Sequence, residues 1–424
     1  MRPMKTAMHE LDNRTGLRGW QHGLVFLIAC GVILSRRPDA IFHAQFYAED
    51  AHVWYADAYN LGWWPALFRT WTGYFLTLPR LAAALALLAP FSLVPLTLNL
   101  IAIPFQALPA NLLLASRSST WGKLRFRALL AATYLVLPNC FEVSLGITDA
   151  NWLLALSALL VLVASLPRGS LSRGLDLILL LLCGLSGPFC MFLLPISVFL
   201  AWKSRERWRW VGAGIFSLAC FVQSWALLFL APAARPHSPM GANPILFLRI
   251  LGGQIYLATL LGGNTLATAR GLGAATFLAC SAIVGTGIVA LCFQKSNLAM
   301  RTFLLFTGMV LLASLVSPAG FALPGVSVWQ QLTMVSGVRY WYFPTLGFAW
   351  ALIWCMHQSN QIFRRTAGAL LCMMCIGVVH DWRHPVFADM HFAEYTRRFE
   401  AAPVGTKIII PVNPAGWNTL LIKR

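Results

Sequence analysis

Long apolar runs, separated by short basic clusters, fill most of this chain. Residues of the AVILMFWYC set make up 58% of the 424 residues and charged residues only 11%, whereas about 25% of a soluble domain is charged. The length leaves room for roughly nine to eleven spans of about 20 residues each, with their loops. We therefore predict an all-α polytopic membrane protein.

The net charge of +18 comes from basic residues placed between the apolar runs. This placement is typical of a topology signal, and we expect membrane lipids rather than nucleic acid as partners. The basic segment 1–20 predicts a cytoplasmic N-terminus, and the clusters at 203–209 and 364–365 predict cytoplasmic loops. We expect a transmembrane domain over 1–379 and a small extracytoplasmic tail over 380–424, in the inner (plasma) membrane of a bacterium.

Three features leave this topology open. The pair Arg36–Arg37 lies at the outer end of the first predicted span, where basic residues are disfavoured. Segment 76–115 holds either one interrupted span or two short ones, and this choice decides whether the number of spans is odd or even. Segment 245–270 contains polar residues and paired glycines, so it is either a full span or an interfacial or re-entrant piece.

Most acidic residues fall in segments that we predict to be external. Ten of the fourteen Asp and Glu residues belong to this set: Asp39, Glu49, Asp50, Asp57, Glu142, Asp149, Asp381, Asp389, Glu394 and Glu400. Any chemistry that depends on carboxylates is therefore expected on the extracytoplasmic face.

The first external loop, 36–75, combines acids with aromatic rings and is expected to form interfacial helices. On such a helix Asp50 and Asp57 share one face with Trp54, and Glu49 points to the neighbouring face. Adjacent carboxylates near lipid either have a raised pKa or bind a cation or a basic partner, as a general base or a metal site requires. The alternative is a solvated loop whose acids balance nearby arginines.

Two external arginines favour a binding site. Arg339 precedes a span among aromatic rings, including Tyr340, and Arg80 follows the acidic loop. A guanidinium at that depth can bind a lipid phosphate bidentately. Each arginine can instead extend to the headgroups or pair with Glu49 or Asp50.

A polar break at 138–152 supplies further candidate contacts. Asp149 and Asn151 offer hydrogen-bonding groups, and the ring of Trp152 could stack on a sugar. Helix capping by the side chain of Thr148 or Asp149 is the structural explanation that we expect to hold in any case. His52 completes the predicted substrate contacts, although external histidines show no zinc-binding spacing.

The tail contains an amphipathic stretch at 392–399, followed by a β-branched run bounded by Gly and Pro at 405–417. These patterns predict a helix, then one short strand and a turn. We expect the tail to pack over the external face as a lid or substrate contact.

The chain has no phosphate-binding Gly-rich loop and no Gly-x-Ser-x-Gly elbow, so nucleotide hydrolysis and serine-ester chemistry have no support.

The acidic pair in Tyr47-Ala-Glu-Asp-Ala51, placed after a first span, resembles the GT-C class of integral membrane glycosyltransferases. Asn60-Leu-Gly-Trp-Trp64, the segment 73–80 and the tail motif Val-Asn-Pro-Ala-Gly-Trp417 are similar to a group of bacterial multi-pass membrane proteins. The GT-C resemblance implies a sugar donor carried on a polyprenyl phosphate or diphosphate, and transfer to a glycan, lipid or protein acceptor outside the cytoplasm.

By the same resemblance, Asp50 or Glu49 is the base that deprotonates the acceptor hydroxyl, and Arg339, with Arg80, holds the donor phosphate. The resemblance leaves open whether a divalent metal ion binds Glu49 and Asp50, and whether Asp57 takes part.

Three alternative functions also stay open. A lipid or solute transporter or flippase would share the interrupted helices and phosphate contacts. A non-catalytic envelope-assembly protein would need neither the acids nor Arg339, and an O-antigen ligase or polymerase would depend more on external arginines.

Overall fold

The computed structural model describes residues 16–230, 239–263, 272–318 and 323–424. It is 72% helical, and seven of its helical segments are long and apolar enough to cross a membrane. These segments are α2 (Gly19–Arg36), η2 with α7 (Phe91–Leu93, Val94–Leu114), α12 with η5 (Arg207–Trp225, Ala226–Leu230), α13 with η6 and α14 (Pro244–Leu248, Arg249–Leu257, Ala258–Leu261), α16 (Leu272–Lys295), α17 (Leu298–Val316) and α20 (Gln361–His380). The prediction of an all-α membrane protein is confirmed at this level.

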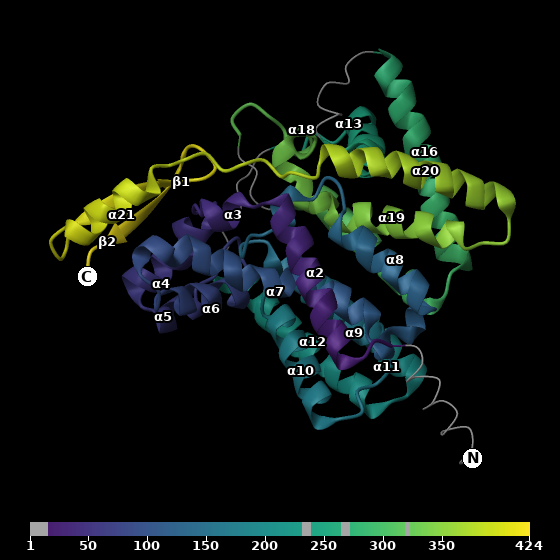
Figure 1. The fold of residues 1–424 in the computed structure, drawn as a ribbon, viewed down its shortest axis with the longest axis horizontal. Helices are drawn as coiled ribbons and strands as arrows, with labels where there is room; N and C mark the ends of the chain where they lie inside the picture. The colour runs from purple at the N-terminus through teal and green to yellow at the C-terminus, as the bar shows by residue number, and fades with distance from the viewer. Residues whose placement is uncertain (1–15, 231–238, 264–271, 319–322) are drawn as a thin grey trace.

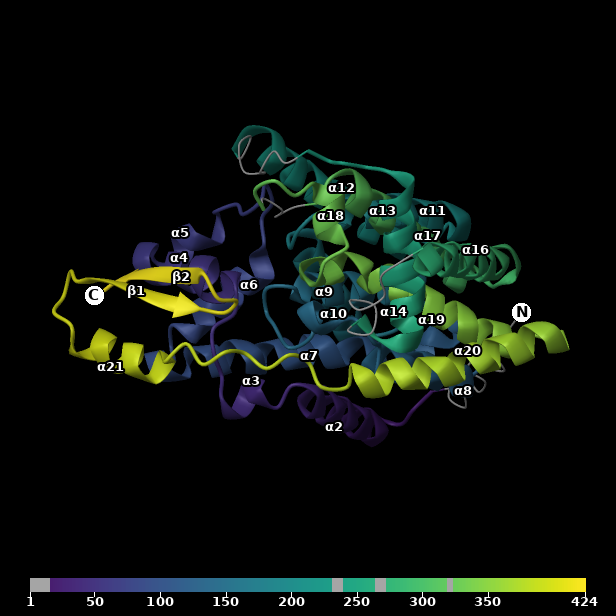
Figure 2. The same cartoon turned by 90° about the horizontal axis from the view of Figure 1, so that it is seen from above.

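Two shorter helices form the centre of the bundle (Figures 1 and 2). They are α9 (Ala150–Val163) and α19 (Tyr342–Met356), and nearly all of their residues are buried. A helix that is apolar on every side is stable only when protein covers it all round. The bundle is completed by α8 (Leu124–Leu135), α10 (Ser170–Gly184) and α11 (Phe189–Ser204).

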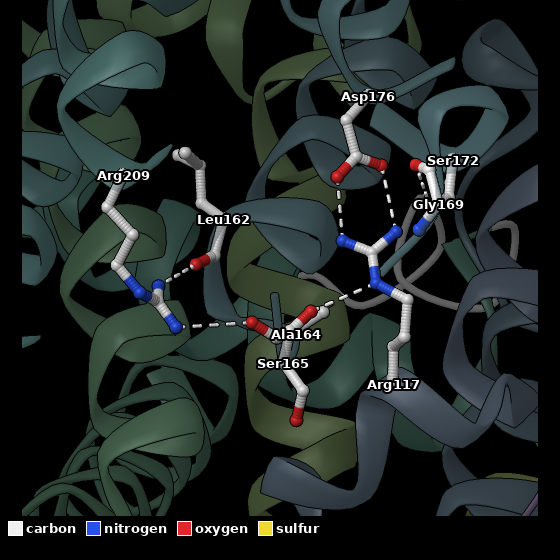
Figure 3. Close-up of polar contacts among 8 residues, drawn as sticks. All are labelled: Arg117, Leu162, Ala164, Ser165, Gly169, Ser172, Asp176 and Arg209. Atoms are coloured by element: carbon white, nitrogen blue, oxygen red, sulfur yellow. Dashed lines mark hydrogen bonds and ion pairs between the residues drawn. The ribbon is translucent and has the colours of Figure 1, made fainter. Parts of the chain in front are cut away.

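One end of the bundle gathers the turns that carry the basic clusters, and we call it the basic end. Arg117, in η3 (Ser116–Trp121), binds both carboxylate oxygens of Asp176 at 2.9 and 2.6 Å, and its Nε donates to the carbonyl of Ser165 (Figure 3). Arg209 donates to the carbonyls of Leu162 and Ala164. The two arginines thus satisfy carbonyl groups at the C-terminus of α9, which the helix itself leaves without donors.

The opposite end, which we call the acidic end, holds the predicted external segments. The side chains of Arg36 and Arg37 are both buried there and donate to backbone carbonyls rather than facing water. Arg36 reaches Leu137 O at 2.9 Å, and Arg37 reaches Ser144 O at 3.0 Å. The pair therefore ties α2 to the loop after α8, which explains basic residues at this position.

Segment 76–115 contains a single helix of spanning length. The short α6 (Thr77–Ala86) stays at the acidic end, where Thr77 N donates to Leu185 O at 3.1 Å. Only α7 then runs towards the basic end, so the cluster at 117–127 lies with the other basic turns. The segment at the acidic end therefore includes α6, beyond residue 75, where we expected the first external loop to end.

The helical segment Pro244–Leu261 is attached to the acidic end along its length. Before it, the carbonyl of Pro239 accepts from Val328 N at the start of α18 (Val328–Leu332). In its middle, Gln254 Nε2 donates to Thr333 O at 2.8 Å, and after it Gly263 N donates to Asp381 Oδ2 at 2.8 Å. Although its length and composition would allow a span, these contacts favour the interfacial alternative.

The tail forms a helix and a hairpin against the first external segment. The helix α21 (Phe392–Ala401) matches the amphipathic stretch, but the prediction of one strand was wrong: β1 (Lys407–Val412) pairs antiparallel with β2 (Trp417–Ile422). The second strand was missed because turn residues separate it from the β-branched run. Thr419 Oγ1 donates to Ala51 O, so the hairpin covers the acid-bearing segment.

Candidate functional site

The predicted acidic pair lies at the start of a π-helix, η1 (Asp50–Tyr55), which leads into α4 (Ala56–Leu61) and α5 (Trp63–Leu67). Asp50 is only 2% exposed, and its Oδ1 accepts a hydrogen bond of 2.6 Å from Thr148 Oγ1. Trp54 Nε1 donates to the same Thr148 oxygen at 3.1 Å. The two residues Asp50 and Trp54 thus contact one partner, as expected for residues on a common face.

Asp57 belongs to a different group of charges. Its Oδ1 binds Arg69 at 2.9 Å and its Oδ2 binds Arg80 at 3.0 Å. The Arg80 side chain is 1% exposed and lies over the ring of Trp54 at 5.1 Å. The structure therefore pairs Arg80 with a loop acid, but with Asp57 instead of Glu49 or Asp50.

Arg339 lies in η7 (Val335–Trp341), directly before the central helix α19. Its backbone N–H donates to Glu142 Oε2 at 2.9 Å, and its guanidinium lies 5.3 Å from the ring of Tyr340. Burial alone would lower the pKa of Arg339, but Tyr340 and the carboxylates of Asp149 and Glu142 hold it above its usual range. Arg339 and these acids thus stabilise each other's charged forms.

Three carboxylates of this region, those of Asp50, Asp149 and Glu142, have raised pKa values. Burial raises the pKa of Asp50 to about 7, with a contribution from Glu49, against the hydrogen bond from Thr148. Burial also raises the pKa of Asp149 to about 7, despite the nearby charge of Arg339. The pKa of Glu142 rises for the same reason. We call Glu49, Asp50, Glu142, Asp149 and Arg339 the acidic cluster.

Three segments far apart in the sequence build this cluster. Asp149 occupies the N-cap position of α9, and Glu142 belongs to η4 (Phe141–Val143) just before it. The expected cap by Thr148 or Asp149 was wrong, because the side chain of Asp149 makes no capping hydrogen bond and Thr148 donates to Asp50 instead. The central helix α9 therefore begins beside η1, and α19 begins beside η4, through the hydrogen bond from Arg339 to Glu142.

The other predicted contact residues have packing partners. Trp152 is 7% exposed and packs against the ring of Phe189 at 4.9 Å and that of Tyr340 at 6.1 Å. Asn151 Oδ1 accepts from the backbone of Trp152. His52 is exposed and faces the tail, with its Nδ1 2.5 Å from Asn418 O. Sugar binding by Trp152, Asn151, Tyr340 and His52 stays a prediction.

Two residues of this region were missed by sequence reasoning. Tyr47 stacks on Phe387 with ring centroids 4.9 Å apart, and burial and the charge of Glu142 raise the pKa of its phenol. Arg37 is close enough to lower the pKa of Asp50. Tyr47 has no sequence signal of its own, because an aromatic ring near a span end is an ordinary interfacial residue. The position of Arg37 was unusual in the sequence, but its effect on the pKa of Asp50 could not be predicted from it.

The described residues give no candidate metal site. Among them, no group of three or more His, Cys, Asp and Glu side chains is close enough to hold a metal ion. We therefore derive no chemistry through a metal ion.

Comparison with known proteins gave no relative from which a role could be transferred. No protein-family model matches the chain, and no curated protein matches it. The function must therefore be argued from the site.

Proposed function

We propose that the protein is a GT-C-like membrane glycosyltransferase that acts at its acidic end. The observation that carries the proposal is a group of neighbouring charges from three separate segments: Glu49, Glu142 and Asp149 act on Arg339, and Asp50 is close to Glu49 and Asp149. Buried carboxylates with raised pKa values beside a fixed cation are common at catalytic sites.

In this proposal the acidic end faces outward from the inner (plasma) membrane of a bacterium. The basic turns lie together at the other end, as expected for the cytoplasmic side. The helices that connect the two ends are α2, α7, α8, α9, α10, α11, α12, α16, α17, α19 and α20. This path starts in the cytoplasm and leaves the tail outside, and it reaches the upper limit of the predicted roughly nine to eleven spans.

Asp50 is the general base of the proposed reaction. A base works best when its pKa lies near the working pH, and the pKa of Asp50 is about 7. Asp50 takes the proton of the acceptor hydroxyl, whose oxygen bonds to the anomeric carbon of the donor sugar. The bond between that carbon and the phosphate oxygen breaks, and its electrons leave with the polyprenyl phosphate, or with the polyprenyl diphosphate when the donor is a diphosphate.

Arg339 stabilises the charge that develops on the leaving phosphate. Four carboxylates would repel a phosphate if all were ionised, but the raised pKa values of Asp50, Glu142 and Asp149 reduce the negative charge that it meets. Arg80 is held by Asp57 and supports Trp54, so we assign the phosphate contact to Arg339.

The experiment that tests this proposal compares wild type with Asp50→Asn in lipid nanodiscs. A panel of polyprenyl-phosphate and polyprenyl-diphosphate sugars is supplied with mixed acceptors, and the released polyprenyl phosphate or diphosphate is measured. Asp50→Asn should lower turnover by at least about 100-fold, because the amide cannot take the proton. Asp389→Asn, an exposed tail acid of the same end, is the matched control and should keep normal turnover.

Near-normal turnover in Asp50→Asn would contradict the proposal. Movement of the lipid across the bilayer without sugar release would favour a transporter or flippase instead.

A further inference from the structure

The hydroxyl of Thr148 bridges two polar groups of η1. It lies 2.6 Å from Asp50 Oδ1 and 3.1 Å from Trp54 Nε1. Thr148 directly precedes Asp149, so the loop before α9 brings this hydroxyl to η1. One hydroxyl therefore connects the proposed base to a buried indole.

When Asp50 is ionised, the chemistry of the three groups fixes the direction of both hydrogen bonds. An indole N–H only donates, so the Thr148 oxygen must accept from Trp54. The single hydroxyl proton then points to Asp50 Oδ1. Thr148 is held as a donor to the carboxylate, and the second oxygen, Oδ2, is left to take a proton.

Trp54 is itself held in place. Its ring is 1% exposed, lies beneath the guanidinium of Arg80 at 5.1 Å, and meets the ring of Trp71 at 6.5 Å. Arg80 is fixed in turn by its ion pair with Asp57. The donor that orients Thr148 therefore has little freedom to turn away.

We propose that Thr148, oriented by Trp54, is the positioning residue of Asp50: it fixes the carboxylate and favours its charged form. The catalytic meaning of this assignment rests on the proposed function, but the effect on Asp50 does not. The other charges facing Asp50 are Glu49 on its own segment, Arg37 at the end of α2, and Asp149 beside α9. None of them is removed when Thr148 is changed.

The test measures the protonation of Asp50 without an activity assay. Dicyclohexylcarbodiimide modifies protonated carboxyl groups, and mass spectrometry of the peptide that contains Asp50 gives its labelling at each pH from 5 to 9. Thr148→Val keeps the shape of the side chain but removes the hydroxyl, so the labelling midpoint should rise by about one pH unit. Trp54→Phe should shift it in the same direction by less, and Thr148→Ser should restore the wild-type midpoint.

The matched control is Thr345→Val in α19, because the Thr345 hydroxyl is buried without a hydrogen-bond partner among the described residues. An unchanged midpoint in Thr148→Val would overturn the inference, as would the same shift in Thr345→Val. If the midpoint shifts as expected while no sugar transfer is found in wild type, the proposed function fails and the positioning of Asp50 by Thr148 stands. If Thr148→Val does not elute as a folded protein, Trp54→Phe and Thr148→Ser decide the question by the same midpoints.

Discussion

At the scale of single residues, burial decides the properties of the acidic cluster. Asp50 and Asp149 both have a pKa of about 7 because their charged forms lose water, and the neighbouring Glu49 raises both further. Arg339 and Thr148 oppose this effect at Asp149 and Asp50, respectively. The balance leaves each acid able to exchange a proton near neutral pH.

The pH dependence of transfer follows from this balance. A general base must be deprotonated before it reacts, so kcat/KM should rise from pH 5 to 8 with a midpoint near the Asp50 pKa of about 7. At pH 6 the rate should be about tenfold below its plateau. A profile measured in nanodiscs that is flat, or that falls over this range, would contradict the assignment of Asp50 as the base. The Asp389→Asn control should keep the wild-type profile.

Several of these residues could be chosen from the sequence, and others could not. Asp50, Glu49 and Arg339 stand out because charges near a membrane need partners. The hydrogen bond from Thr148 to Asp50 joins two residues that are 98 positions apart in the chain, so no local pattern predicts it. A local rule favours Thr148 or Asp149 as a helix cap, and the tertiary contact prevails over it.

At the scale of elements, the charged side chains of the candidate site lie at helix ends. The central helices α9 and α19 carry no charged residue, so the charged groups near them lie at their ends. At the acidic end α9 begins beside η1 and α19 beside η4, while at the basic end arginines bind carbonyls at the end of α9. The apolar pattern predicts both helices, but it does not predict that η1 winds as a π-helix, because no local residue pattern distinguishes that turn.

The ion pair between Arg117 and Asp176 should matter for stability rather than for transfer. The Asp176 side chain is 6% exposed and accepts two hydrogen bonds from Arg117. Asp176→Asn weakens this contact and should lower the free energy of unfolding by about 1–3 kcal/mol. The expected result is an apparent melting temperature several degrees lower in nanodiscs, with transfer activity at 25 °C preserved. Glu206→Gln, an exposed acid of the same end, is the control and should leave the melting temperature unchanged. An unchanged melting temperature in Asp176→Asn would show that this contact does not hold α9 in place.

At the scale of the whole molecule, most of the acidic residues lie in segments at one end. The membrane class and the separation of acids from bases follow from composition and from the spacing of the basic clusters. The path through 76–115 and the position of 244–261 could not be predicted, because a short apolar stretch fits a span or a surface helix equally well. Tertiary hydrogen bonds, such as those from Thr77 to Leu185 and from Gln254 to Thr333, favour a surface helix over a membrane span for α6 and for 244–261.

The central claim is that the acidic cluster binds the phosphate of a lipid-linked sugar. Its most direct test is a cryo-electron microscopy structure of the protein in nanodiscs with an excess of a polyprenyl phosphate, the product of the proposed reaction. We predict that the phosphate lies within hydrogen-bonding distance of the Arg339 guanidinium, on the side that faces Asp50. Phosphate density at the basic end, beside Arg117 and Arg209, with none at Arg339, would contradict the account.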